Sequence, residues 1–132
     1  MIARLTKSSD HVSDPFFDTN ILIDWFKDRA QASAELSRYK RHRISRIVWT
    51  EVLSGETLER RDVVQQAIAP FEVVEIDARI ASAAADIRYR SKMKLLDAYI
   101  LATAQVNGAI LITRNTKDFP ANMPGIRVPY TL

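Results

Sequence analysis

The sequence contains no cysteine and only two histidines among its 132 residues. The lack of cysteine excludes disulfide bonds and thiolate metal sites, and it fits a protein of a reducing compartment. Two histidines do not favour a zinc site, which usually takes several histidine or cysteine ligands. A metal ion bound to this chain would therefore be held mainly by oxygen atoms, as Mg²⁺, Mn²⁺ and Ca²⁺ are.

The chain also lacks any long hydrophobic run. No apolar stretch reaches the length that spans a bilayer. Residues 1–14 are polar, without periodicity, and lack the apolar core of a secretory signal. We interpret them as a flexible leader before one domain over residues 15–132, which is long enough for a substantial core. We therefore expect a cytoplasmic protein without a membrane partner.

The composition is that of a soluble globular protein, with 47% apolar and 27% charged residues. The net charge is +3, and the basic residues concentrate in two segments, 27–46 and 88–94. One such cluster is usually a solvated surface, whereas two beside an acidic site favour a polyanionic partner. The candidates for holding a nucleic-acid backbone are Lys40, Arg41, Arg43, Arg46, Arg88, Arg90 and Lys94.

Short apolar segments alternate with segments of helical periodicity, and there is no internal repeat. The pattern predicts strands at 16–17, near 44, and at 71–76, 109–113 and 126–128. It predicts helices at 20–28, 31–39, 46–54, 57–69, 78–91 and 95–108, with Asp18 or Asn20, Ser45 and Asp77 as caps. Alternating strands and helices favour an α/β sandwich with a mostly parallel sheet.

Four acidic residues follow predicted strands or lie near the starts of predicted helices. Asp18 and Asp118 follow strands, while Glu51 and Asp97 belong to the early turns of helices. Singly, each has an ordinary explanation: a helix cap or helix-dipole contact, a turn residue, or, for Glu51, an exposed position or a salt bridge. In a parallel sheet, however, strand ends and helix starts share one edge, so the four carboxylates can converge.

Converging carboxylates repel one another and need cations, and ligation by oxygen alone favours Mg²⁺ or Mn²⁺. Such a metal site suits hydrolysis of a phosphodiester. Two other functions stay open at this point. One is an aspartyl phosphohydrolase with Asp18 as covalent nucleophile, although Asn20 stands where such enzymes carry a second aspartate. The other is an RNA-binding module whose acidic site is degenerate.

Several segments in unbroken order over residues 15–128 resemble one known family. They are FFDTNILID, ISRIVWTEVLSGE, LLDAYILATAQVNGAILITRNTKDF and MPGIRV. Together they resemble the PIN-domain ribonucleases, and among them the VapC-type toxins of prokaryotic toxin–antitoxin pairs. The resemblance implies a PIN-like three-layer α/β/α sandwich. It also implies a Mg²⁺- or Mn²⁺-dependent endoribonuclease that leaves 5′-phosphate and 3′-hydroxyl ends.

The resemblance also assigns roles to individual residues. It implies that the catalytic and metal-binding acids are Asp18, Glu51, Asp97 and Asp118, with the fourth position open because some members carry an acid where Asn115 stands. The groups that hold these carboxylates or the water in place would be Thr19, Asn20, Thr113 and Asn115. The resemblance further implies a homodimer and a small antitoxin protein that occupies the active-site groove.

Overall fold

The computed structural model describes residues 14–132, and in that range five short strands form one sheet. The strands are β1 Phe16–Phe17, β2 Arg43–Ser45, β3 Glu72–Val74, β4 Leu111–Ile112 and β5 Ile126–Arg127. Their order is β3-β2-β1-β4-β5, and every neighbouring pair is parallel. The predicted sheet, which was expected to be mostly parallel, is thus parallel throughout the described range.

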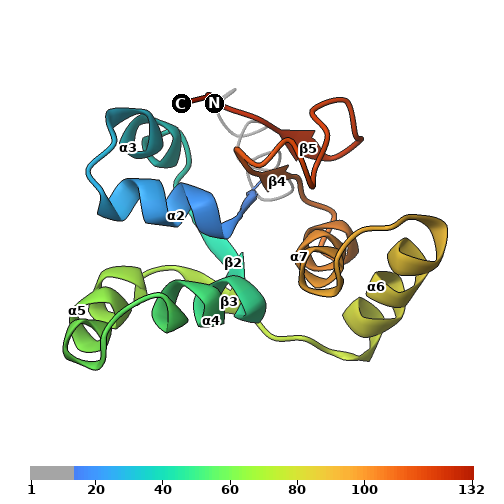
Figure 1. Cartoon of the computed structure of the whole chain (residues 1–132), viewed down its shortest axis with the longest axis horizontal. Helices are drawn as coiled ribbons and strands as arrows, with labels where there is room; N and C mark the ends of the chain where they lie inside the picture. The colour runs from blue at the N-terminus through green and yellow to red at the C-terminus, as the bar shows by residue number, and fades with distance from the viewer. Residues whose placement is uncertain (1–13) are drawn as a thin grey trace, which may run out of the picture.

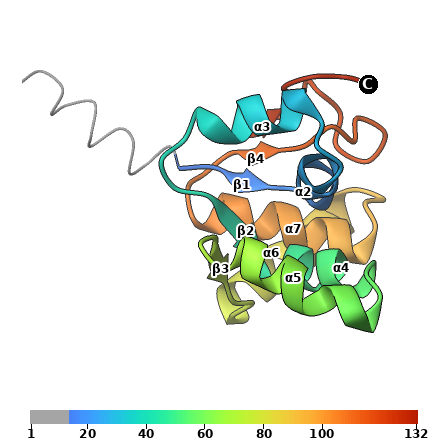
Figure 2. The ribbon, with the colours of Figure 1, turned by 90° about the vertical axis from the view of Figure 1, so that its left-hand side faces the viewer.

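Helices cover both faces of this sheet. They are α2 Thr19–Phe26, α3 Ala30–Ser37, α4 Arg46–Ser54, α5 Leu58–Ile68, α6 Ala78–Arg90 and α7 Leu95–Val106. Figure 1 shows α6 and α7 on one side of the strands and α2, α3 and α5 on the other side. Figure 2 shows the same arrangement after a turn of 90°, with β1 and β4 side by side. The predicted three-layer α/β/α sandwich is confirmed.

Three helices begin at polar residues that follow or approach a strand end. Asp18 Oδ1 accepts a hydrogen bond from the Thr19 amide at 2.8 Å, and Ser45 Oγ accepts one from the Val48 amide at 3.1 Å. Asp77 Oδ1 does the same for the Ile80 amide at 2.9 Å. These caps satisfy amides that have no partner inside the helix, so α2, α4 and α6 begin where the sequence predicts.

Three strands are shorter than predicted, and one of them is β5, which was expected at 126–128 and contains Ile126 and Arg127. The strand expected at 109–113 is β4, with only Leu111 and Ile112, because Ala109 still belongs to the end of α7: its amide donates to Ala104 O at 3.0 Å. Ladder hydrogen bonds extend β4 by one residue on each side, from the Phe16 amide to Ile110 O and from the Thr113 amide to Arg127 O. The strand expected at 71–76 is β3, three residues long.

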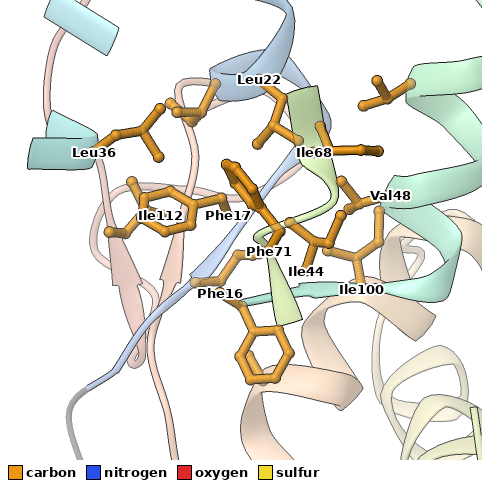
Figure 3. Close-up of a cluster of buried hydrophobic side chains, with 14 of the residues drawn as sticks. Phe16, Phe17, Leu22, Leu36, Ile44, Val48, Ile68, Phe71, Ile100 and Ile112 are labelled. Carbon is orange, nitrogen blue, oxygen red and sulfur yellow. The ribbon is translucent and has the colours of Figure 1, made fainter. Parts of the chain in front are cut away.

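The core forms between the sheet and the helices on both of its faces. Figure 3 shows Phe16 and Phe17 of β1 among buried side chains from β2, β4, α2, α3, α4, α5 and α7. A second cluster joins α6 to α7 through Ile80, Ala84, Ala98 and Ala102, where small side chains allow the two helices to lie close together. The central strand that delivers Asp18 is therefore packed on every side.

The predicted leader, residues 1–14, lies outside the described residues except for Asp14. Asp14 is buried, and its backbone oxygen accepts a hydrogen bond from Arg43 Nη2 at 2.6 Å. Across residues 14–132, the helices are all too short or too polar to cross a bilayer.

Ile44 at the centre of β2 provides a test of this core. It is fully buried, and we expect Ile44→Ala to lower the free energy of unfolding by about 2–5 kcal/mol, because it removes buried methyl groups and leaves a cavity. Urea unfolding followed by circular dichroism measures the change. The matched control is Leu58→Ala on α5, where the side chain is 76% exposed and the expected change is within about 0.5 kcal/mol. Equal losses in both variants would contradict this packing.

Candidate acidic active site

A cleft of about 490 Å³ opens at the edge of the sheet where β1 and β4 end. Three predicted acidic residues line it, each from a different helix start or helix face: Asp18 caps α2, Glu51 lies on α4, and Asp97 lies in the first turn of α7. The full lining consists of Asp18, Thr19, Asn20, Ile23, Glu51, Ser54, Asp97, Arg114 and Asn115. The topology thus brings together carboxylates that are far apart in the sequence.

Asp18 is held by neutral donors. Its Oδ2 atom accepts hydrogen bonds from Thr113 Oγ1 at 2.8 Å and from Asn20 Nδ2 at 3.1 Å, and its Oδ1 atom accepts one from the Thr19 amide. The side chain is only 5% exposed. Burial raises the pKa of Asp18, the hydrogen bonds act against burial, and the charge of Glu51 adds to the rise. The net direction is upward, so a charged Asp18 is costly in this position.

Glu51 is connected to Asp18 through Thr19. The Thr19 hydroxyl donates to Glu51 Oε1 at 2.6 Å, while the amide of the same residue donates to Asp18. Glu51 is half-buried, so it is neither the exposed residue nor the salt-bridge partner that the sequence left open. One threonine therefore fixes the separation between the first two carboxylates.

The fourth acidic position is shared by Asn115 and Asp118, in the loop after β4. Asn115 lines the cleft, and its Nδ2 atom donates to Asp118 Oδ2 at 2.8 Å. The Asp118 amide donates back to Asn115 Oδ1 at 3.2 Å, and the Asn115 amide donates to Thr113 Oγ1 at 3.0 Å. Asn115 thus lines the cleft itself, and Asp118 is connected to the cleft by its hydrogen bonds with Asn115.

The pKa of Asp97 depends on the charges of the other three acids. Its pKa rises from the ordinary 3.8 to about 6, first because it is partly buried and then because Asp118, Asp18 and Glu51 are negative. Lys94, at the start of the same helix, lowers the pKa of Asp97 by a smaller amount. Asp118, Asp18 and Glu51 therefore lie near enough to Asp97 for their charges to act on it.

The protein contains a second kind of buried acid, which the sequence reasoning missed. Asp24 on α2 is paired with Arg114 through two hydrogen bonds of 2.6 and 2.8 Å, and Glu35 on α3 is paired with Arg127 through bonds of 2.7 and 3.0 Å. Burial raises the pKa of Asp24, but hydrogen bonds from Arg114 and Tyr130 bring it below its usual value. These acids are paired with a cation of the protein itself.

Within residues 14–132, the acids of the cleft form no such ion pair. Over the part of the chain that the structure describes, none of the ion pairs involves Asp18, Glu51, Asp97 or Asp118. A buried charge without a partner is unfavourable unless a cation binds beside it. The contrast with Asp24 and Glu35 therefore marks the cleft as the place where the fold leaves negative charge uncompensated.

The predicted basic residues fall into two groups. Arg41 and Arg43 lie at the amino end of β2, opposite the acidic edge; Arg41 pairs with Asp14 and Glu72, and the Arg43 guanidinium covers the ring of Phe16. Lys40 precedes them in the chain. The structure does not bring these three residues to the cleft.

The remaining basic residues lie after β2 or around the turn between α6 and α7. Arg46 begins α4, where it stacks on Trp49 and pairs with Glu75. Arg88 and Arg90 form the last turn of α6, and Arg88 Nη1 donates to Met93 O at 2.9 Å. Lys94 directly precedes α7 and is close enough to influence Asp97.

The side chains of the cleft suit a hard divalent cation by their chemistry. They offer carboxylate, amide and hydroxyl oxygens, which Mg²⁺ and Mn²⁺ prefer, and among the described residues none of their carboxylates is held in an ion pair. Within residues 14–132, the structure contains no group of three acidic or histidine side chains that are close enough together to bind one metal ion. Asp18, Glu51 and Asp97 are the residues that would hold it, with Asn115 or Asp118 at the fourth position.

The sequence matches the model of a known family over most of its length. The PIN-domain model aligns with residues 16–122. The chain belongs to the PIN-domain family. The match spans all four acidic positions as well as Asn115, so the cleft of this PIN domain lies wholly inside the matched region. No curated protein sequence matches the chain.

Solved structures agree with this assignment. A chain of a toxin–antitoxin complex from Klebsiella pneumoniae is 42% identical, with a TM-score of 0.84, and the alignment covers 89% of this chain and 99% of that chain. A chain of the DNA-bound VapBC complex from Salmonella typhimurium is 25% identical with a TM-score of 0.73, covering 87% of this chain and 96% of that one. FitAcB from Neisseria gonorrhoeae, at 23% identity and a TM-score of 0.74, covers 89% and 99% and shares the fold.

The raised pKa of Asp97 gives a pH dependence with a defined sign. Because the folded-state pKa of about 6 exceeds the ordinary 3.8, the folded protein retains a proton that the unfolded chain loses. The contribution of Asp97 to stability is therefore greatest below about pH 4 and is lost as the pH rises through 6. We expect a loss of about 1–2 kcal/mol from this group after allowing for solvent screening.

Urea unfolding in EDTA between pH 4 and 7 measures this effect. Asp97→Asn should remove the pH-dependent part, so the variant gains stability over the wild type as the pH rises. The control, Asp62→Asn at an exposed position of α5, should follow the wild type. If the curves for Asp97→Asn and the wild type ran parallel, Asp97 would not experience the charge of the cluster.

Proposed function

We propose that this PIN-domain protein is a Mg²⁺- or Mn²⁺-dependent endoribonuclease and the toxin of a toxin–antitoxin pair. The observation that carries the proposal is a cleft whose carboxylates form no ion pair among the described residues, in contrast with the paired acids Asp24 and Glu35. Membership of the PIN-domain family and 42% identity to a chain of a toxin–antitoxin complex support it.

In this proposal the acids of the cleft divide their work by position. Asp18 and Asp97 hold the metal ion, and Glu51, with Asn115 or Asp118, completes the site and orients the attacking water. When bound, the ion would lower the pKa of a water molecule and offset the charge that develops on the phosphate.

Neutral hydrogen bonds keep the carboxylates in place without neutralising them. Thr113 and Asn20 fix the Oδ2 atom of Asp18, and Thr19 joins Asp18 to Glu51. A carboxylate whose partners are hydroxyl and amide groups keeps its full negative charge for a cation. Because these partners orient the carboxylates, they matter as much for metal binding as the acids themselves.

RNA must approach this acidic cleft despite the charge of its phosphates. Lys94 is the best placed of the basic candidates, since its charge already influences Asp97. Arg46, Arg88 and Arg90 are candidates for longer-range contacts to the RNA backbone, whereas Arg41 and Arg43 are engaged at the opposite edge of the sheet. Attack of water on the phosphorus with breakage of the P–O3′ bond, as the resemblance to the PIN-domain ribonucleases implies, would leave 5′-phosphate and 3′-hydroxyl ends.

The proposed protein partner is a small antitoxin that occupies the acidic groove, with a homodimer of this chain as the toxin unit. The proposal rests on the Klebsiella pneumoniae complex, whose aligned chain is matched over 99% of its length. A negatively charged cleft is complementary to a basic segment of such a partner. The site of action in this proposal is the cytoplasm, where RNA is available.

Cleavage of single-stranded RNA by the purified protein tests the enzyme directly. We expect cleavage with Mg²⁺ or Mn²⁺, none in EDTA, and a loss of at least ~100-fold in Asp97→Asn, because one ligand of the ion is removed. Asp62→Asn, on the exposed face of α5, should retain the wild-type rate. Gel analysis of end-labelled RNA measures the rates and the chemistry of the ends.

The same experiment separates the competing functions. Cleavage that persists in EDTA or in Asp97→Asn would overturn the metal-dependent mechanism. RNA binding without cleavage, together with no Mn²⁺ binding in calorimetry, would support a degenerate RNA-binding module. A phosphorylated Asp18 trapped from a small phosphate ester would support the aspartyl phosphohydrolase instead.

Expression in a bacterial host tests the toxin assignment. Induction of the wild-type chain should arrest growth and produce new RNA 5′ ends, whereas Asp18→Asn should allow growth at the same level of protein. Growth curves, immunoblots and sequencing of RNA ends provide the measurements. Arrest by both versions would show that toxicity does not come from the acidic cleft.

A further inference from the structure

We propose that Arg114 is a positioning residue, which fixes the Asp18 carboxylate through Asn20 while its own guanidinium is held by the buried carboxylate of Asp24. This inference deepens the proposed nuclease function and rests on it where activity is concerned. The residue belongs neither to the acidic set nor to the basic clusters of the sequence.

The side chain of Arg114 is anchored on α2. Its Nε atom donates to Asp24 Oδ2 at 2.6 Å and its Nη2 atom donates to Asp24 Oδ1 at 2.8 Å, and Asp24 is only 2% exposed. The Tyr130 hydroxyl donates to the same Oδ2 atom at 2.8 Å. A bidentate pair of this kind fixes orientation as well as distance, because the guanidinium is planar.

The backbone amide of Arg114 connects the anchored residue to the cleft. Its amide donates to Asn20 Oδ1 at 3.0 Å, and the other end of the Asn20 amide donates to Asp18 Oδ2 and to Thr113 Oγ1. This contact determines which way the Asn20 amide faces: with its oxygen on the Arg114 amide, its NH₂ group must point toward Asp18.

Arg114 also determines where its two neighbours lie. Thr113 donates its hydroxyl to Asp18, and Asn115 enters the cleft and binds Asp118. These two residues and the Asn20 contact belong to one short segment after β4, and the ion pair with Asp24 is a further tie between that segment and α2, the helix that Asp18 caps. A shift of this segment would therefore displace the Thr113 hydroxyl and reorient the Asn20 side-chain amide, two of the three neutral donors to Asp18.

The arrangement argues for positioning rather than for direct contact with RNA. Arg114 lines the cleft, and 30% of its side chain is exposed. The edge of the guanidinium formed by its Nε and Nη2 atoms is nevertheless engaged by Asp24, a carboxylate that is almost fully buried. Substitution of a residue that positions the cleft groups should change kcat and metal affinity, whereas substitution of a residue that binds the substrate directly should change KM.

The chain contains a matched control for this ion pair. Arg127 of β5 binds Glu35 of α3 through the same two guanidinium atoms at 2.7 and 3.0 Å, and the Tyr39 hydroxyl completes that group at 3.0 Å. The exposed fractions are alike: 34% for the Arg127 side chain and 5% for Glu35. This pair joins a helix to a strand, whereas the Arg114 pair joins a helix to the segment after a strand, and none of its recorded hydrogen bonds or ion pairs involves a cleft carboxylate.

The first test is independent of catalysis. We would record the side-chain amide signals of Asn20 by NMR in the metal-free protein and measure Mn²⁺ binding by calorimetry. Arg114→Met and Asp24→Asn should shift the Asn20 signals and weaken Mn²⁺ binding by about 10-fold, and the double variant should be no weaker than either single one. Arg127→Met should lower Tm by a similar amount but leave the signals and the affinity unchanged.

The second test uses RNA cleavage. Arg114→Met should reduce kcat by about 10- to 100-fold with KM changed less than threefold, because the reacting groups are displaced while the substrate-binding surface remains. Arg114→Lys, which retains the charge but loses the bidentate contact, should fall between. Tyr130→Phe, which removes a single hydrogen bond and is expected to fold normally, should show a smaller loss of kcat in the same direction. Arg127→Met should stay within twofold.

Three outcomes would overturn the inference. Equal losses in Arg114→Met and Arg127→Met would mean that stability alone is responsible, and a rise in KM without a change in kcat would make Arg114 a substrate contact. Unchanged Asn20 signals and Mn²⁺ affinity in Tyr130→Phe and Arg114→Lys would remove the geometric link. If the wild type bound Mn²⁺ but cleaved no RNA, the proposed function would fail while the Asn20 and Mn²⁺ measurements still decided the role of Arg114.

Discussion

The rest of the structure depends on negative charge that is gathered at one edge of the sheet and not neutralised there. Asp18 is almost fully buried, yet its partners are a hydroxyl, an amide and a backbone N–H rather than an arginine. Neutral donors orient a carboxylate and reduce the cost of burial without cancelling its charge. The fold thus preserves an electrostatic imbalance that a divalent cation can relieve, and this imbalance separates the cleft from every other acidic group that is buried in the described chain.

The ion pairs of Asp24 and Glu35, by contrast, neutralise buried negative charge. Asp24 and Glu35 are also buried, but each accepts two hydrogen bonds from one arginine and a third from a tyrosine. Their pKa values lie below the usual range, because these hydrogen bonds outweigh burial. A carboxylate of this kind is committed to the fold and has no capacity for a metal ion. One chain therefore uses the same chemical group in two ways, and the identity of the donors decides which.

The sequence was sufficient for features that depend on local physics. Asp18, Ser45 and Asp77 cap helices, because a short polar side chain before an apolar periodic segment can accept a hydrogen bond from an amide of the first turn that has no partner in the helix. The parallel α/β sandwich follows from alternating elements, and the edge shared by Asp18, Glu51 and Asp97 follows from that topology. The lengths of the strands were less predictable, because the chain around Ala109 serves the end of α7 rather than β4.

Contacts between distant residues were beyond the sequence. Asp24 and Arg114 are separated by 90 positions, and no periodicity relates them. Nor did composition reveal that Arg41 and Arg43 belong to the edge opposite the cleft, since a cluster in sequence is divided in space when a strand begins inside it. The expectation that two basic clusters lie beside the acidic site fails for Arg41 and Arg43 for this reason, whereas Lys94 of the second cluster acts on the pKa of Asp97.

The shortness of the strands explains why the long-range ion pairs matter for the site. β1, β4 and β5 contain two residues each, so the ladder between them supplies few hydrogen bonds and sets the relative position of their ends only weakly. Side-chain ion pairs provide further links between these elements. Arg114 joins the segment after β4 to α2, and Arg127 joins β5 to α3. A cleft whose carboxylates come from separate elements needs such ties, because repulsion among its own groups would otherwise drive those elements apart. The paired acids thus provide the rigidity that allows the unpaired acids to remain close together.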